Sequence, residues 1–402
     1  MSKKISLAVV ATLMAITAAV TFSITILFSM QYFNQKVQSL SEREAAYAKL
    51  AEVDGIVRGN VNGTIDETAL NDNIAAGYMR GLGSKLGTYY SAASYASYLA
   101  TASGQITGVG IETVAESSGY RKITAVYAGS PAEENGLMVQ DLIIKVGDTD
   151  LANAGGVTYE SLMTGDVGSN VTLTIRRGTE ESAVTLTRRK ITIQSVYSRT
   201  ITDNTGASVG YLKIKTFDDQ TLSQFISAFE GMRQEGISRF VFDVRENSGG
   251  SLEVAASILD KLLPEGVIAS YRDKNETESV LYESTGDGTQ ITAAVVLVGS
   301  GTAAEGEMFA AAIGDSGYGK LVGSATAGNG GYRKIFRLND GSALRLNVGT
   351  LLTGSGASFD GTGVKLDFTV ELASEQKKDM TTLTDDNDTQ LNKALEILSA
   401  SK

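Results

Sequence analysis

The sequence predicts a multidomain chain of mixed α/β and α+β class, with an N-terminal transmembrane helix, a helical segment, a β-rich domain and an α/β core. Three observations predict it. A long apolar run opens the chain, short alternating strands occupy its middle, and strands alternate with amphipathic helices over its C-terminal half. We expect the four parts to span residues 1–36, 37–104, 105–190 and 191–402.

Composition excludes several classes of function. The chain has 402 residues and a formal net charge of −11, so we expect no nucleic-acid partner, because phosphate binding requires clustered Lys and Arg. It contains no His and no Cys, which removes Ser-His-Asp triads, Cys-His pairs, disulfides and the usual zinc ligands. We therefore expect no metal and no cofactor. Nucleophilic chemistry would have to use Ser or Thr, with Lys or a carboxylate as the base.

The N-terminus indicates a membrane anchor. Lys3 and Lys4 precede an uncharged, mainly apolar run of 29 residues from Ile5 to Phe33, and the next charge is Lys36. This run exceeds the ~20 residues that span a bilayer and the roughly 7–15 of a signal-peptide core. The leading lysines favour a cytoplasmic N-terminus with the bulk of the chain extracytoplasmic. The alternative is a long cleaved signal peptide, which also places the remaining chain outside.

Residues 37–104 have a helical pattern. Apolar residues recur at helix-like intervals in SEREAAYAKLAEVDGIV, and again in DETALNDNIAAGYMRGLGSKLG before a Gly-rich stop. Two interpretations stay open for this segment. One is a dimerisation element, joining two copies or one copy and an active relative. The other is a helical linker packed on the domain that follows.

From Thr107 onward the pattern changes to short strands. GVGIETV, YRKITAVY and DLIIKVGDTDL alternate apolar and polar residues, and NVTLTIRRG with ESAVTLTRRKI forms a hairpin-like pair. This order resembles a PDZ domain, in which Gly108, Val109, Gly110 and Ile111 match the carboxylate-binding loop and the start of its strand. Such a loop holds a terminal carboxylate on backbone N–H groups while the peptide adds a strand to the sheet edge. The resemblance implies peptide or protein C-termini as ligands; a PDZ-shaped spacer that binds nothing is the alternative.

The C-terminal unit alternates strands and helices. GYLKIKTF, SRFVFDVRENSGG and TAAVVLVGS have the composition of buried strands, while TLSQFISAFEGMRQEG and SLEVAASILDKLLPEG have the periodicity of amphipathic helices. Sites in such sheets gather at the carboxyl ends of strands. Two Gly-containing turns stand at such ends, one at Gly249 and Gly250 and one in VGSGTAAEGEMFAAAI.

These turns carry a resemblance to the carboxy-terminal processing peptidases, membrane-linked serine proteases with a PDZ domain before a Ser/Lys catalytic core. FDVRENSGG resembles that family's D-L-R-x-N-P-G-G, and the resemblance implies an oxyanion hole at Gly249 and Gly250. The family's S-A-S-A-S-E motif aligns with Ala304 at the nucleophile position. Its G-K-G-x-x-Q motif aligns with Asn329 at the lysine position and Arg333 at the glutamine position.

All three catalytic positions have therefore changed. A methyl group cannot attack a carbonyl, and an amide side chain cannot act as a general base. One change would fit an engineered knockout, whereas three together predict a natural pseudoenzyme. Glu305 also replaces a small residue beside the nucleophile position, where a carboxylate would repel a developing oxyanion.

The changed positions favour a membrane-anchored homologue that binds C-termini without cleaving. Two alternatives to this interpretation remain open. The first is an active serine-type endopeptidase with a displaced nucleophile, Thr302 or Ser300, and Lys320 or Lys334 as base. That site requires a lysine desolvated enough to be neutral near pH 7, a pKa shift of ~3 units. The second is a PDZ scaffold of the cell envelope that has no connection to proteolysis.

Overall fold

The computed structural model describes residues 7–154, 158–286, 291–378, 380 and 383–400, and the chain divides into two compact units after Asn71. The first helix, α1 (Leu7–Asn60), runs without a break through the boundary expected at residue 36. Within it, Thr12–Met30 is long and apolar enough to cross a membrane, by length and composition alone. Such a helix fits both an anchor and a signal sequence.

The segment expected to be helical also contributes a strand. Two further helices, α2 (Glu67–Leu82) and α3 (Ala92–Ala102), confirm most of the helical pattern. Between them, β1 (Gly87–Tyr90) pairs antiparallel with β18 (Ala343–Thr353) of the C-terminal unit. The helical prediction for residues 87–90 was wrong, because the partner that makes them a strand is distant in sequence.

The β-rich domain is built as the sequence predicts. Its sheet has the order β3-β4-β5-β7-β8, with β6 paired to β5, and β2 pairs separately with β9. The strands are β2 (Gln105–Gly108), β3 (Ile111–Ala115), β4 (Arg121–Val126), β5 (Leu142–Val146), β6 (Thr149–Asp150), β7 (Asn170–Arg177), β8 (Glu180–Thr187) and β9 (Arg189–Thr192). The short helices are α4 (Pro131–Glu134), η1 (Leu151–Asn153) and α5 (Tyr159–Met163).

A six-stranded sheet forms the centre of the C-terminal unit. Its order is β10-β11-β12-β15-β16-β19, with β10 and β11 antiparallel and every later pair parallel. The strands are β10 (Val196–Thr202), β11 (Ser208–Ile214), β12 (Arg239–Asp243), β15 (Ala293–Val298), β16 (Gly319–Gly323) and β19 (Phe368–Thr369). Parallel pairs require long crossover connections, and helices supply most of them here, which explains the alternation seen in the sequence.

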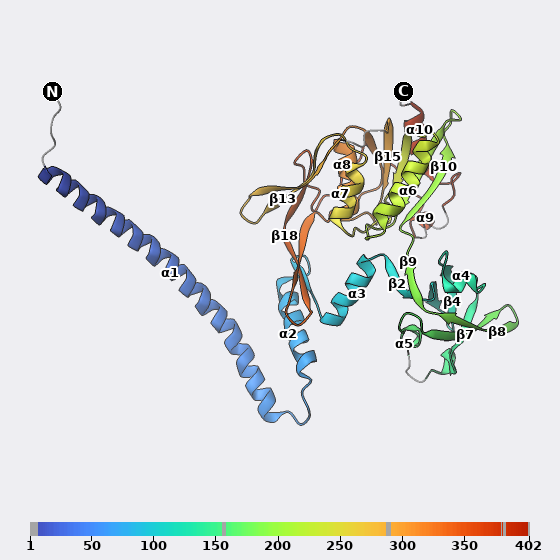
Figure 1. The fold of residues 1–402 in the computed structure, drawn as a ribbon, viewed down its shortest axis with the longest axis horizontal. Helices are drawn as coiled ribbons and strands as arrows, with labels where there is room; N and C mark the ends of the chain where they lie inside the picture. The colour runs from blue at the N-terminus through green and yellow to red at the C-terminus, as the bar shows by residue number, and fades with distance from the viewer. Residues whose placement is uncertain (1–6, 155–157, 287–290, 379, 381–382, 401–402) are drawn as a thin grey trace. The chain divides into compact units, whose positions relative to one another are not determined.

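Helices cover both faces of this sheet. One face packs on α6 (Thr221–Gln234), α7 (Leu252–Asp260) and α8 (Glu305–Asp315), and the other on α10 (Thr389–Ala400) (Figure 1). Along β12, Phe240 and Phe242 face the core under α6, α7 and α8, and Val241 faces the core under α10. Strand alternation requires this arrangement. Phe309 of α8 meets Phe242 edge-on with ring centroids 5.9 Å apart, which fixes the start of α8 over the sheet.

A second sheet flanks α8. It joins β13 (Gly266–Asp273), β14 (Glu278–Ser284) and β17 (Gly331–Arg337) to β18 and β1. A short helix, α9 (Ser374–Lys378), precedes α10. The β13–β14 hairpin was not predicted from the sequence. The sheet matters for the site because β17 carries Arg333 and follows directly from the loop that contains Asn329.

Candidate functional site

The turn between β15 and α8 is tied to the turn that follows β12. The Thr302 hydroxyl donates to the Val244 carbonyl oxygen at 2.7 Å and accepts the Gly299 N–H at 3.0 Å. The Ala303 N–H donates to the carbonyl oxygen of Asn247 at 2.9 Å. The carboxyl ends of these two parallel strands meet at one edge of the sheet, so the two Gly-containing turns form one site.

Ala304, which the sequence is expected to place at the nucleophile position, has an unusual backbone conformation. Its φ of 50° and ψ of −112° lie where a non-Gly residue costs about 1–3 kcal/mol. The Ala304 N–H donates to Oε2 of Glu307 at 3.0 Å, and the residue is only 3% exposed. The turn therefore keeps a strained geometry, but the side chain it carries is a buried methyl group.

The Gly249–Gly250 turn faces Ala304. Their φ angles of 114° and 145° favour glycine, and a Cβ on Gly250 would lie 2.4 Å from the Phe217 carbonyl oxygen. The Gly249 N–H donates to Oδ1 of Asn247 at 2.8 Å, so it is engaged within the turn. The Gly250 N–H donates to Oε2 of Glu305 at 2.9 Å. The turn expected to form an oxyanion hole thus holds a carboxyl group of its own chain.

Glu305 lies in a desolvated position although part of the residue reaches solvent. Burial raises the pKa of Glu305 above its ordinary value, against the opposing effects of the Gly250 amide, its own backbone amide and the positive charges of Arg333 and Arg345. Burial of the Tyr98 phenol is the main cause of its raised pKa, and the negative charge of Glu305 also raises that pKa. The charges of Arg333 on β17 and Arg345 on β18 therefore act on this carboxyl, and its own charge acts on Tyr98 of α3.

Glu307 is a structural residue of the site that the sequence analysis missed. It is completely buried, and its Oε2 accepts the N–H groups of Ala304 and Asn329 at 3.0 and 2.8 Å. Its Oε1 accepts the Thr326 hydroxyl at 2.6 Å and the Gly328 N–H at 2.7 Å. The available signal was a Glu at the third position of a helix, where it closes half of a capping box.

The structure brings Asn329 and Arg333 to the same site as Ala304. Asn329 is joined to Ala304 through Glu307, and its side-chain oxygen accepts a hydrogen bond from Nη2 of Arg333. Both side chains are half-buried. The three residues aligned with the catalytic positions are thus neighbours in space, and the side chains of Asn329 and Arg333 bond to each other.

The structure contradicts Thr302 as a displaced nucleophile. Its hydroxyl is fully buried and bonded on both sides, so no substrate carbonyl can reach it. Ser300 is exposed and lines a cavity of about 430 Å³ that Lys377 also lines. Lys377 is exposed and pairs with Glu371 at 2.6 Å, so it is not a desolvated lysine.

The two lysines considered as bases are charged partners in other contacts. Lys320 is exposed and pairs with Asp367 at 3.0 Å. Lys334 places its ammonium over the Tyr271 ring, 5.3 Å from the centroid. Both side chains are exposed, so neither lysine matches the desolvated base that a displaced site needs.

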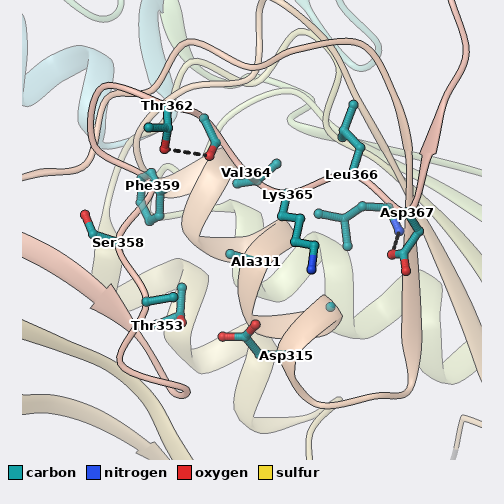
Figure 2. A pocket seen from close by; sticks show the side chains of 14 residues that line it. Ala311, Asp315, Thr353, Ser358, Phe359, Thr362, Val364, Lys365, Leu366 and Asp367 are labelled. Atoms are coloured by element: carbon teal, nitrogen blue, oxygen red, sulfur yellow. Dashed lines mark hydrogen bonds between the residues drawn. The ribbon is translucent and has the colours of Figure 1, made fainter.

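A cavity of about 540 Å³ lies beside α8 (Figure 2). Ala311 and Asp315 of α8 line it together with Thr353 and the loop from Ala357 to Asp367. Its lining contains none of the aligned catalytic positions. Within the described residues, no group of three His, Cys, Asp or Glu side chains is arranged as metal ligands.

A buried ion-pair cluster supports the turn after β12. Arg245 bonds Asp243 at 2.7 Å and Asp388 at 2.8 Å, with all three side chains at most 4% exposed. The Tyr211 hydroxyl donates to Asp243 at 2.6 Å. Burial opposes ionisation of Asp243, but attraction to Arg245 prevails and holds the pKa of Asp243 below its usual value.

The predicted peptide loop of the β-rich domain lies between β2 and β3. Gly108 ends β2, Ile111 begins β3, and β3 is an edge strand of its sheet. Gly110 has φ 84°, and a Cβ there would lie 2.2 Å from Cβ of Ser130. The Val109 carbonyl oxygen accepts the N–H of Ala132 at 2.9 Å. The loop is therefore fixed against the start of α4, beside an open sheet edge.

Comparison with known proteins agrees with this architecture. Residues 208–370 match the model of peptidase family S41, and residues 122–177 match a PDZ domain. The chain is 28% identical to the carboxy-terminal processing protease CtpA of Bacillus subtilis, over 90% of this chain and 77% of that one. It is 29% identical to a carboxyl-terminal-processing protease of Synechocystis, over 76% and 71% of the two chains.

A solved structure shares the fold. The crystal structure of a putative S41 protease from Bacteroides fragilis is similar with a TM-score of 0.51 and 23% identity, covering 74% of this chain and 84% of that one.

Proposed function

The chain belongs to the carboxy-terminal processing proteases, with a peptidase S41 core and a PDZ domain, and we propose that it is a member that no longer cleaves and that acts by binding peptide or protein C-termini. The observation that carries the proposal is Ala304 in the strained turn at the nucleophile position. A methyl group offers no lone pair for attack. Asn329 and Arg333 support it, because neither an amide nor a guanidinium accepts a proton near neutral pH.

A cleavage assay tests the loss of activity. The full chain, held in detergent micelles, is incubated with an unfolded test protein, and we expect no fragments beyond those formed in buffer. Cleavage by the unmodified chain would refute the proposal. If the Ser300→Ala variant then lost that cleavage, the nucleophile would have moved to Ser300.

The PDZ domain is the proposed binding element. The Gly108–Ile111 loop and the open edge of β3 supply the two parts of PDZ recognition, a carboxylate nest and a strand-addition edge. We expect a peptide with a free C-terminus to bind at least about tenfold more tightly than its C-terminal amide, which corresponds to about 1.4 kcal/mol. Equal affinity for the two peptides would contradict this mode of binding.

The apolar start of α1 supports a membrane anchor, with the PDZ domain and the core on the extracytoplasmic side. Thr12–Met30 has the length and composition for one span. N-terminal sequencing of the chain recovered from both the membrane and the soluble fractions of whole cells tests it. A retained apolar run supports an anchor, whereas a start beyond it shows a cleaved signal peptide.

The loss of cleavage also suggests what kind of partner to look for. An inactive member that still binds C-termini would act as a scaffold or a decoy, alone, as a homodimer, or paired with an active relative. Cross-linking of the full chain in membranes distinguishes these. Recovery of an active protease of this family supports the paired form, whereas a non-proteolytic envelope scaffold would recover none.

A further inference from the structure

The Glu305 side chain folds back onto the Gly249–Gly250 turn. Its Oε2 accepts the Gly250 N–H at 2.9 Å. It lies so close to Gly249 that a Cβ there would be 2.3 Å away, and the same Cβ would lie 3.2 Å from Cβ of Ala304. One carboxyl oxygen therefore stands beside both the glycine turn and the residue at the nucleophile position.

This contact uses the group that a peptide would need. In acyl-transfer sites the backbone N–H of such a turn donates a hydrogen bond to the carbonyl oxygen of the bound peptide. Here the Gly250 N–H already donates to Glu305, and the Gly249 N–H donates to Asn247. Ala304 is 3% exposed, as expected if the space over it is filled from within the chain.

We propose that Glu305 is an autoinhibitory plug, whose carboxyl group takes the place of a peptide carbonyl at the Gly250 N–H and keeps an extended peptide from binding at this turn. The proposal rests on the proposed function only for the identity of this turn as part of a substrate site. The contact does not require a negative charge, because an N–H also donates to the carbonyl oxygen of an amide. Glu305→Gln therefore keeps the plug, and Glu305→Ala removes it.

Peptide binding to the full chain in detergent micelles tests this. The probe is an alanine-rich hexapeptide with an acetylated N-terminus, an amidated C-terminus and a fluorescent label, and the missing carboxylate keeps it from the PDZ loop. We expect Glu305→Ala to bind the hexapeptide at least about tenfold more tightly than the wild type or Glu305→Gln does. A tenfold difference in affinity is expected if the plug occupies the turn about nine-tenths of the time, because only the remaining tenth of the molecules can bind. Glu253→Ala is the matched control, because Glu253 is an exposed glutamate in the first turn of α7. It should bind like the wild type.

Two outcomes would overturn the plug. One is equal binding of the capped hexapeptide by the wild type and Glu305→Ala. The other is a Glu305→Gln variant that binds like Glu305→Ala, which would make charge and not occupancy the barrier. If Glu305→Ala fails to fold, Glu305→Ser serves the same comparison. A peptide with a free C-terminus, measured in the same samples, reports on the PDZ domain, so the proposed function and the plug fail separately.

Discussion

Ala304 and Asn329 donate their backbone N–H groups to the same atom, Oε2 of Glu307, at 3.0 and 2.8 Å. They come from different segments, the turn before α8 and the loop before β17. The second carboxylate oxygen accepts two further donors from the latter loop. A single buried carboxylate thus joins the segment aligned with the nucleophile to the segment aligned with the base.

Replacing Glu307 by Gln should destabilise the C-terminal unit strongly. The amide keeps one acceptor oxygen but turns an NH₂ group toward backbone N–H donors, leaving buried donors unpaired. Hydrogen bonds to a charged group are worth about 1.5–3 kcal/mol each, so we expect a loss of about 3 kcal/mol or more. Urea unfolding of the variant measures it. A midpoint equal to that of an exposed Glu253→Gln control would show that the four contacts contribute little.

Glu305→Gln should stabilise the folded chain, and the size of this stabilisation should depend on pH. Burial raises the folded-state pKa of Glu305, so the folded chain binds the proton more tightly than the unfolded chain. Wild-type stability therefore falls as pH rises from the ordinary Glu range through the folded pKa. The variant escapes this loss and can still accept the Gly250 N–H, while Arg333, Arg345 and Tyr98 are unchanged around it. We expect Glu305→Gln to melt higher than the wild type at pH 8, with the difference vanishing below the ordinary pKa of Glu. A constant difference across pH would contradict it.

Restoring the catalytic groups should not restore full cleavage activity while Glu305 remains. The variant Ala304→Ser, Asn329→Lys, Arg333→Gln regains a nucleophile and a base, but the Gly250 N–H still donates to Glu305 and cannot stabilise an oxyanion. Loss of one such donor costs roughly 10²–10³ in rate. We expect cleavage of an unfolded test protein to rise by about this factor when Glu305→Ala is added. Full activity in the three-position variant would refute a role for Glu305.

The periodic parts of the fold were predictable from the sequence. Alternation along β12 places Phe240 and Phe242 on one face and Val241 on the other, so the strand and its burial follow from the residues alone. The two Gly-containing turns were placed at strand ends, where the structure has them. In the PDZ domain, β7 and β8 form the predicted hairpin.

Long-range contacts were not predictable in the same way. Residues 87–90 become a strand only because β18 lies beside them. The position of Glu307 in its helix indicates a cap, but its bonds to Gly328 and Asn329 depend on a loop 21 and 22 residues further along the chain. Glu305 was expected to repel an oxyanion, yet its reach to the Gly250 amide depends on how the backbones of both turns are placed.

Asp243→Asn should be the most costly change to the buried ion pairs. Arg245 would lose one of its two carboxylate partners in an interior where breaking a buried pair costs about 3–5 kcal/mol. Because the folded pKa of Asp243 is lowered, the stability it supplies is present above the ordinary Asp range and is lost as pH falls through the folded value. The loss of unfolding free energy in the variant, measured by urea unfolding, should therefore be largest near neutral pH and shrink in acid.

Asp385→Asn is the control, because it removes the exposed partner of Arg199, and it should cost at most about 1 kcal/mol. Equal deficits for the two variants would show that burial of the Arg245 cluster does not set its contribution.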